Sequence, residues 1–133
     1  MHEIVTWEEF NSKYVEPFGR VGFRFHKDKG FIVWRRGTGY NVELLHIRTF
    51  EKGKGYGREL IYSMLDALLV DPPYYSVFGF TRVGNKEAQA FYGALGFTLQ
   101  TVNGLYKDGK AILFWSPFDK LRRLMNDYLI GPY

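Results

Sequence analysis

An apolar strand, a glycine-rich loop and an amphipathic helix follow one another directly in residues 40–69, and this succession constrains the fold more than any other feature. The predicted strand, Tyr40–Arg48, holds the mainly apolar run Leu44–Ile47, which is typical of a central strand covered on both faces. The loop has glycine at alternate positions between residues 53 and 57. The predicted helix, Arg58–Leu69, has leucine, isoleucine and methionine at helical spacing, so one of its faces is apolar. This unit predicts a sheet with helices packed against it.

Helices and strands alternate through the rest of the chain. In chain order we expect a helix at 7–14, strands at 20–26 and 31–36, the unit described above, a strand at 75–83, a helix at 86–95, strands at 98–106 and 110–115, and a helix at 117–129. Short turns join the first two strands and the last two strands into hairpins. Helices interleaved with hairpins predict an α/β (α+β) domain with a mixed sheet. The strands that flank helix 58–69 should be parallel and joined by a right-handed crossover.

The composition is that of an ordinary globular protein, because 46% of the 133 residues are hydrophobic and 24% are charged. Its 12 Phe, 10 Tyr and 3 Trp can form a sizeable core. The absence of cysteine excludes disulfides, a thiol nucleophile and thiolate metal ligands. No apolar run approaches the roughly 20 residues of a membrane-spanning helix, and the first residues lack the pattern of a signal peptide. We therefore expect a soluble cytoplasmic protein with no membrane partner.

The charge is moderately basic, with a net value of +4 and a pI near 9.3. Three basic residues, Lys52, Lys54 and Arg58, gather in and after the glycine-rich loop, and such clusters attract phosphates. A solubilising surface explains so small an excess of charge more simply than a nucleic-acid site does. The three histidines, at positions 2, 26 and 46, show no metal-ligand spacing, so no metal site is predicted.

The glycine-rich loop has the features of an anion site. The first turn of a helix offers unpaired N–H groups and positive potential, and glycines let a ligand approach the backbone closely. The segment Gly53–Gly57 matches neither the P-loop pattern nor the dinucleotide-binding pattern. On physical grounds it therefore indicates a phosphate without specifying the ligand, and a plain flexible connection is the alternative.

A second motif lies in the predicted helix 86–95 and the residues around it. Asn85 stands at the N-cap position, and Gly96 ends the helix. Ala88, Phe91 and Leu95 share the face that packs on the sheet, and Tyr92 lies beside that face. The Tyr92 hydroxyl could therefore reach a cleft while its ring is held, although a half-buried core tyrosine would give the same pattern.

Together the two motifs resemble the GCN5-related N-acetyltransferase (GNAT) superfamily. Residues Ile47–Gly57 resemble its acyl-CoA-binding motif, and Asn85–Phe97 resemble its second motif, which often reads N-x-x-A-x-x-F-Y-x-x-x-G-F. The resemblance implies a twisted mixed sheet whose central parallel strands, here 40–48 and 75–83, splay apart. It also implies helices on both faces and a single domain over 1–133. The segment 117–133 would be an extra C-terminal helical extension, which covers the sheet or pairs two chains.

The resemblance implies acetyl-CoA as co-substrate, with its pantetheine arm between the splayed strands. Backbone amides of the loop would hold the pyrophosphate, and the amide of Ile47 would polarise the thioester carbonyl. Lys52 departs from the Arg or Gln of the family, and this keeps the charge but loses the fork geometry. The residues predicted to bind the cofactor are Ile47, Lys52, Gly53, Lys54, Gly55, Tyr56, Gly57, Arg58 and Asn85.

The same resemblance implies that Tyr92 protonates the departing CoA thiolate after direct attack by an amine. The amine must lose a proton to attack, so a base or a water chain is needed. Our candidate is Glu43, which by period-two alternation shares a face with Leu45 and Ile47. His46 is the alternative base. Glu43 could equally be a structural partner of an arginine, either Arg35 or Arg82.

Two classes of function remain open at this point. The first is an N-acetyltransferase that acts on a primary amine in a small molecule or a protein, as a monomer or a homodimer. The second is a binding module that keeps the fold without turnover and engages a protein or a nucleic acid. The intact loop and Tyr92 favour the enzyme.

Overall fold

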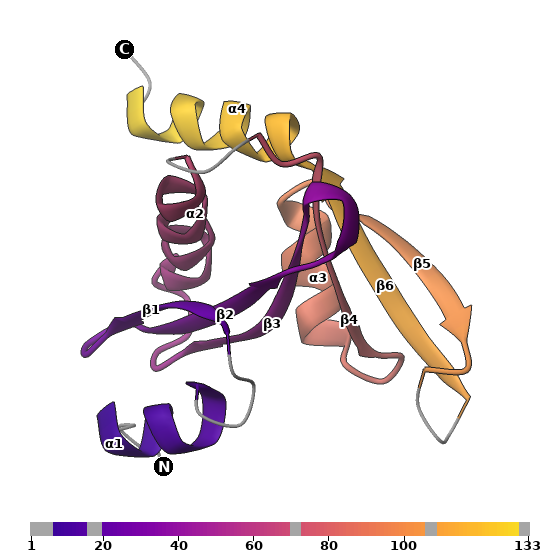
Figure 1. Cartoon of the computed structure of the whole chain (residues 1–133), viewed down its shortest axis with the longest axis horizontal. Helices are drawn as coiled ribbons and strands as arrows, with labels where there is room; N and C mark the ends of the chain where they lie inside the picture. The colour runs from indigo at the N-terminus through magenta and orange to yellow at the C-terminus, as the bar shows by residue number, and fades with distance from the viewer. Residues whose placement is uncertain (1–6, 16–19, 70–72, 106–108, 131–133) are drawn as a thin grey trace.

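The computed structural model of the chain describes residues 7–15, 20–69, 73–105 and 109–130 (Figure 1). Within these ranges six strands form one sheet, in the order β1-β2-β3-β4-β6-β5. The strands are β1 (Gly22–His26), β2 (Gly30–Arg36), β3 (Asn41–Thr49), β4 (Ser76–Arg82), β5 (Thr98–Asn103) and β6 (Lys110–Pro117). Neighbouring strands are antiparallel except β3 and β4, which are parallel. The mixed sheet predicted from the sequence is confirmed.

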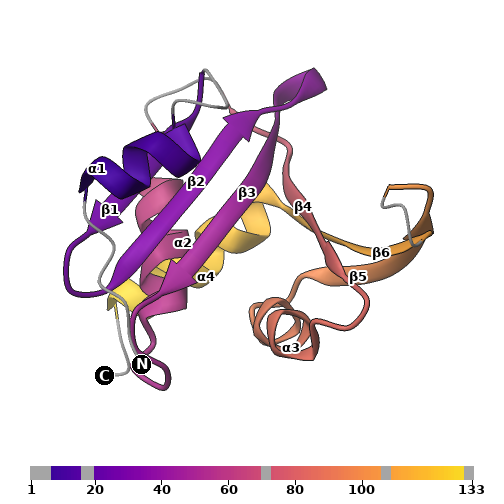
Figure 2. The same ribbon diagram turned by 90° about the horizontal axis from the view of Figure 1, so that it is seen from below.

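Helices cover both faces of the sheet (Figures 1 and 2). They are α1 (Trp7–Phe10), the π-helical η1 (Asn11–Val15), the 3-10 turn η3 (Thr38–Tyr40), α2 (Tyr56–Leu68), α3 (Lys86–Ala94) and α4 (Phe118–Ile130). Side chains of α2, α3 and α4 join one large apolar cluster with β2, β3, β4 and β6, which we call the main core. On the other face, Phe10 of α1 packs with Phe31, Val33 and Phe50 in a smaller cluster, which we call the aromatic core. The predicted cover on both faces of the central strand β3 is thus confirmed.

The central parallel strands pair only at their beginnings. Their register runs from Asn41 opposite Ser76 to Glu43 opposite Phe78, and both strands then continue unpaired with each other. Figure 2 shows β3 and β4 diverging beyond this point. Gly79 is the first residue of β4 after the pairing ends, and a Cβ there would lie 2.3 Å from the Phe114 ring and 2.8 Å from the Leu44 carbonyl oxygen. The close approach of these groups therefore requires glycine at position 79.

A β-bulge changes the facing of side chains along β3. Val33 pairs with His46 but Trp34 pairs with Leu44, so Leu45 is an extra residue opposite β2. As a result, Leu45 packs against the aromatic core, and Ile47 packs against the main core. The expectation that Glu43, Leu45 and Ile47 share one face is therefore wrong, because strict alternation holds only in a strand without an extra residue.

Element boundaries differ from those expected at several places, among them the first helix, α2 and α4. The first helix is α-helical only to Phe10 and continues as a π-helix to Val15. Helix α2 begins at Tyr56, two residues early, because Gly55 serves as its N-cap in a left-handed conformation. Strand β6 continues through Pro117, which pairs with Ser76, so α4 begins one residue later than expected.

The C-terminal helix α4 packs within the chain. Phe118, Leu121 and Met125 are buried in the main core. The Tyr128 ring lies 5.2 Å from the ring of Tyr62 on α2. Among the described residues no helix is long and apolar enough to span a bilayer.

Candidate active site

A cleft of about 520 Å³ opens where the end of β3, the loop after it, and helices α2 and α3 meet. We call it the first cleft. All predicted cofactor residues except Lys54 line it, and so does Tyr92: they are Ile47, Lys52, Gly53, Gly55, Tyr56, Gly57, Arg58, Asn85 and Tyr92. The two motifs that are separate in the sequence thus form opposite walls of one cleft. Lys54 is exposed and lies outside the lining.

The loop wall of the first cleft depends on two glycines with left-handed backbones. Gly53 and Gly55 both have φ +76°, and a Cβ at either position would meet no atom within 4 Å. The backbone conformation, rather than lack of space, therefore favours glycine there. The N–H of Glu59 bonds the Gly55 carbonyl as the first helical bond of α2, at 3.2 Å. The N–H groups before Glu59 remain for a ligand, where the helix dipole favours an anion.

The third glycine of the motif brings α2 and α3 together. A Cβ on Gly57 would lie 2.7 Å from the Phe91 ring, so glycine here permits the two helices to meet at the cleft. Phe91 is partly buried against the main core. Gly57 thus sets the distance between the two walls, a role different from that of Gly53 and Gly55.

Tyr92 presents a buried ring to the first cleft. The residue is only 4% exposed, and its ring stacks on Phe114 with centroids 3.7 Å apart and an angle of 11°. Phe91 and Phe97 contact it edge-on. Burial raises the pKa of the Tyr92 hydroxyl well above its ordinary value of 10.0. The phenol therefore stays protonated at neutral pH and can act as a proton or hydrogen-bond donor.

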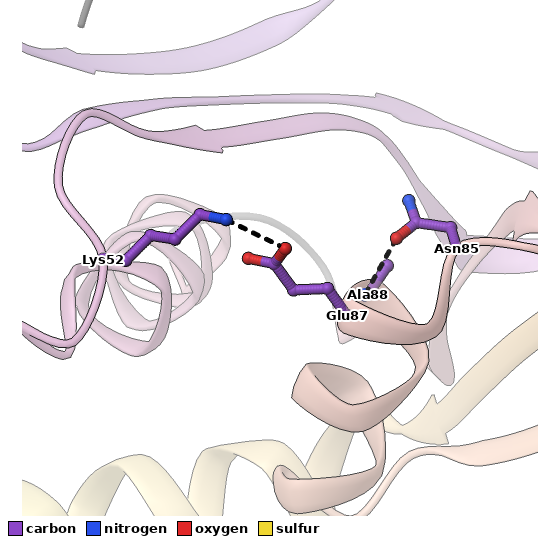
Figure 3. Close-up of polar contacts among 4 residues, drawn as sticks. All are labelled: Lys52, Asn85, Glu87 and Ala88. Carbon is purple, nitrogen blue, oxygen red and sulfur yellow. Dashed lines mark hydrogen bonds and ion pairs between the residues drawn. The ribbon is translucent and has the colours of Figure 1, made fainter. Parts of the chain in front are cut away.

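An ion pair joins the two walls of the first cleft (Figure 3). The Lys52 Nζ lies 3.1 Å from an oxygen of Glu87, in the first turn of α3. Beside it, the Asn85 Oδ1 accepts a hydrogen bond of 3.1 Å from the Ala88 N–H, which confirms Asn85 as the N-cap. The side chains of Lys52 and Glu87 are 82% and 72% exposed, so their pairing contributes little to stability.

Sequence reasoning missed two acidic residues of the first cleft. Glu51 and Glu87 line it together with the basic residues. Glu51 lies within the acyl-CoA motif and Glu87 within the second motif, so their positions in the sequence placed them near the predicted site. Neither motif requires an acidic residue at these positions, so the structure was needed to show that both residues line the first cleft.

A second cleft of about 1120 Å³ lies between the end of β3, the end of β4 and the β5–β6 hairpin. Leu45 and His46 of β3 line it, whereas Ile47 lines the first cleft. Asn85 lines both clefts. Because the bulge turns Leu45 and Ile47 to opposite faces of the sheet, the two clefts approach the gap between β3 and β4 from opposite sides.

The two candidate bases occupy different surroundings. Glu43 accepts two contacts from the Arg35 guanidinium, at 2.9 and 2.8 Å, and lines neither cleft. This is the structural pairing with Arg35 that the sequence left open. His46 lines the second cleft and is partly buried. Burial, and to a lesser degree the charge of Lys13, lowers the pKa of His46 below its ordinary value of 6.5. Its imidazole is therefore neutral at pH 7.

The described part of the chain has no group of side chains placed to bind a metal ion. No cluster of three or more His, Asp or Glu side chains there is arranged to hold a metal ion. The groups that the clefts offer are backbone N–H groups, a protonated phenol, a neutral imidazole, the carboxylates of Glu51 and Glu87, and several cations.

Comparison with known proteins identifies the family. The model of the acetyltransferase (GNAT) family matches residues 6–97, and the chain belongs to that family. A search of curated proteins finds no relative of this sequence. The family predicted from the two motifs is thus confirmed by a match that spans both of them.

Solved structures of several other proteins share this fold. Ard1 from Thermoplasma volcanium is 26% identical, with 67% of this chain and 62% of that chain covered and a TM-score of 0.57. A GNAT-family acetyltransferase from Bacillus cereus ATCC 10987 is 21% identical, with 83% and 78% covered and a TM-score of 0.59. NAA60 from Arabidopsis thaliana, in complex with acetyl-CoA, is 17% identical, with 66% and 64% covered and a TM-score of 0.54. The chain thus spans less than two thirds of the Thermoplasma and Arabidopsis proteins.

Proposed function

We propose that this chain transfers an acetyl group from acetyl-CoA to a primary amine by direct attack. One observation carries the proposal: two clefts that share Asn85 in their walls are both lined by residues of β3 beyond the point where β3 and β4 part. A protonated tyrosine lines one cleft, and a neutral histidine lines the other. Two substrates can therefore reach one point from opposite sides, each beside a group suited to move a proton.

The first cleft fits the cofactor of the family. The free N–H groups at the start of α2 and the cations of Lys52 and Arg58 suit a pyrophosphate. Ile47, on β3 beyond its pairing with β4, suits the thioester carbonyl that the family motif assigns to it. The Arabidopsis relative in complex with acetyl-CoA supports the same ligand here.

The chemistry requires the transfer of two protons. The amine nitrogen attacks the thioester carbonyl carbon, a C–N bond forms, and the C–S bond breaks. His46 takes the proton that the amine loses, and Tyr92 gives its proton to the departing sulfur. His46 is better placed for this than Glu43, because His46 lines a cleft and Glu43 is engaged by Arg35.

Replacement of Tyr92 by Phe tests the proposal. We expect kcat to fall by about 10²-fold or more, because a general acid contributes roughly 10²–10⁴-fold. The affinity for acetyl-CoA should be unchanged, since Phe keeps the stacking on Phe114. Release of the CoA thiol from acetyl-CoA, with a mixture of primary amines, measures turnover, and calorimetry measures affinity.

The matched control is Tyr62→Phe. Tyr62 is likewise a buried tyrosine, but it lies on α2 and packs against Tyr128, outside both clefts. Its turnover should equal that of the parent chain. If Tyr92→Phe turned over at the parent rate, Tyr92 would be a packing residue, and the assigned protonation of the sulfur would be wrong.

A further inference from the structure

The C-terminal helix α4 places one aromatic side chain beside a residue of the first cleft. Leu121 and Met125 hold α4 in the main core, and Tyr128 follows them at helical spacing on the same side of the helix. The Tyr128 ring packs on α2, with its centroid 5.2 Å from that of Tyr62. It also faces Arg58, whose guanidinium carbon lies 5.5 Å from the ring centroid. Because Arg58 lines the first cleft, α4 contacts a residue of the proposed cofactor site.

The contact between Arg58 and Tyr128 is a cation–π interaction, in which the face of the ring attracts the guanidinium. This attraction involves no oxygen acceptor, so the N–H groups of the guanidinium remain available to phosphate oxygens. Lys52 differs, because its ammonium group is paired with the carboxylate of Glu87. In the part of the chain that the structure describes, no carboxylate forms an ion pair with Arg58. Arg58 is thus held near the cleft without being neutralised.

The Tyr128 ring restricts a side chain that would otherwise be mobile. Arg58 is exposed, so without a partner its long side chain would sample many rotamers. A ligand that pairs with such a side chain must restrict it, and this restriction costs binding free energy. Because the ring limits the rotamers of Arg58 before a ligand arrives, part of that cost is removed from the binding step.

We propose that Tyr128 is a positioning residue for the cofactor, which holds the Arg58 guanidinium where it can pair with the pyrophosphate of CoA. The inference rests on the proposed binding of acetyl-CoA and adds α4 to that site. The family match ends at residue 97, so this contact comes from a part of the chain beyond the match. Tyr128 acts only through Arg58 and takes no part in the transfer of the acetyl group.

Calorimetry with CoA as the ligand tests the inference on single variants. Tyr128→Leu keeps an apolar side chain against α2 but removes the ring, so the Kd should rise about 2–5-fold, the range typical of an exposed cation–π contact. Tyr128→Phe keeps the ring, so its Kd should equal that of the parent chain. Arg58→Gln should raise the Kd about tenfold or more, because it removes a charged hydrogen bond to phosphate.

The double variant Arg58→Gln/Tyr128→Leu shows whether Tyr128 acts through Arg58. If it does, loss of the ring changes nothing once the guanidinium is gone, so the Kd of the double variant should equal that of Arg58→Gln alone. A merely structural role for Tyr128 would weaken binding equally in both backgrounds, and this result would overturn the inference. The control, Tyr75→Leu, removes a more exposed tyrosine that packs edge-on against Tyr40 and lines neither cleft, so its Kd should equal that of the parent chain.

The outcomes also separate this inference from the proposed function. If the parent chain binds CoA and Tyr128→Leu binds it equally tightly, Tyr128 does not position Arg58, and the proposed acetyl transfer is unaffected. If the parent chain does not bind CoA, the proposed function is wrong, and the inference falls with it. Dephospho-CoA keeps the pyrophosphate but lacks the phosphate on the ribose, so the effect of Tyr128→Leu should persist with this ligand. An effect confined to CoA would overturn the pairing of Arg58 with the pyrophosphate.

Discussion

At the scale of single residues, the assignment of His46 as base predicts how rate depends on pH. Its pKa lies below 6.5 in the folded chain, so the imidazole loses its capacity to accept a proton as the pH falls through that lowered value. We expect kcat at saturating acceptor to show an acidic limb below pH 6.5. In His46→Gln this limb should be absent, and the rate at neutral pH should be lower by about 10²-fold or more.

The control for this profile is His26→Gln. His26 is exposed on β1 and lines neither cleft, so both the rate and the acidic limb should persist in His26→Gln.

The dependence of stability on pH gives an independent measure of the lowered pKa of His46. The unfolded chain binds the proton of residue 46 more readily than the folded chain, so stability should fall as the pH drops below about 6.5 and should fall less in His46→Gln. An unchanged acidic limb in His46→Gln would refute His46 as the base.

Glu87 gives a second prediction at this scale. Its carboxylate faces Lys52 in the cleft where we expect a pyrophosphate, so it competes with the phosphate for the same ammonium group. Glu87→Gln should tighten binding of CoA by about 2–5-fold, the range typical of an exposed charge pair. Asp66→Asn removes one exposed acid from α2 outside the first cleft and should leave affinity unchanged. Weaker binding in Glu87→Gln would show that the carboxylate assists the ligand.

At the scale of elements, the sequence predicts what depends on neighbours along the chain. The N-cap at Asn85, the left-handed Gly96 and the glycine-rich entry to α2 all follow from local chemistry, and the structure confirms them. The bulge at Leu45 depends on the register of β3 against β2, which no local pattern specifies. For the same reason the facing of Glu43, Leu45 and Ile47 was mispredicted.

The second cleft could not be predicted from local sequence patterns either. Its walls come from β3, β4 and the β5–β6 hairpin, which are adjacent only because β6 pairs between β4 and β5. Lys110 and His46 are 64 positions apart (110 minus 46), and no motif links them. The first cleft was predictable because each of its walls is one continuous motif, and the second cleft was not because its residues are scattered.

The parting of β3 from β4 leads to a prediction about stability. Gly79→Ala places a Cβ against the Phe114 ring and the Leu44 carbonyl oxygen, and the backbone oxygen of a paired strand cannot yield easily. We expect a loss of about 1–3 kcal/mol in the free energy of unfolding, measured in urea. Because Phe114 stacks on Tyr92, turnover should fall as well.

Gly93→Ala is the matched control for that substitution. Gly93 lies within α3, and a Cβ there would meet nothing within 4 Å. Alanine should therefore stabilise the chain by about 0.4–1 kcal/mol, through its higher helix propensity and the reduced entropy of the unfolded chain. Equal effects at the two positions would mean that the contacts of Gly79 do not constrain β4.

At the scale of the whole molecule, the sheet separates two tasks. One face presents the loop and the two helices that we propose for the cofactor, and the other presents the cleft lined by His46 that we propose for the acceptor. Both clefts are lined by residues of β3 beyond Glu43, where β3 and β4 no longer pair. Each task can therefore be altered without the other, so His46→Gln should leave the affinity for acetyl-CoA unchanged.

Thermal unfolding with acetyl-CoA, CoA and ATP, each added separately, tests the central claim most directly. A ligand at about 100 times its Kd adds about 2.7 kcal/mol to the stability of the folded state, which raises the Tm by several degrees. Acetyl-CoA and CoA should raise the Tm, ATP should not, and Gly55→Asp, which sets a carboxylate at the start of α2, should abolish the shift. No shift with acetyl-CoA or CoA in the parent chain would contradict the account and would favour a binding module without turnover.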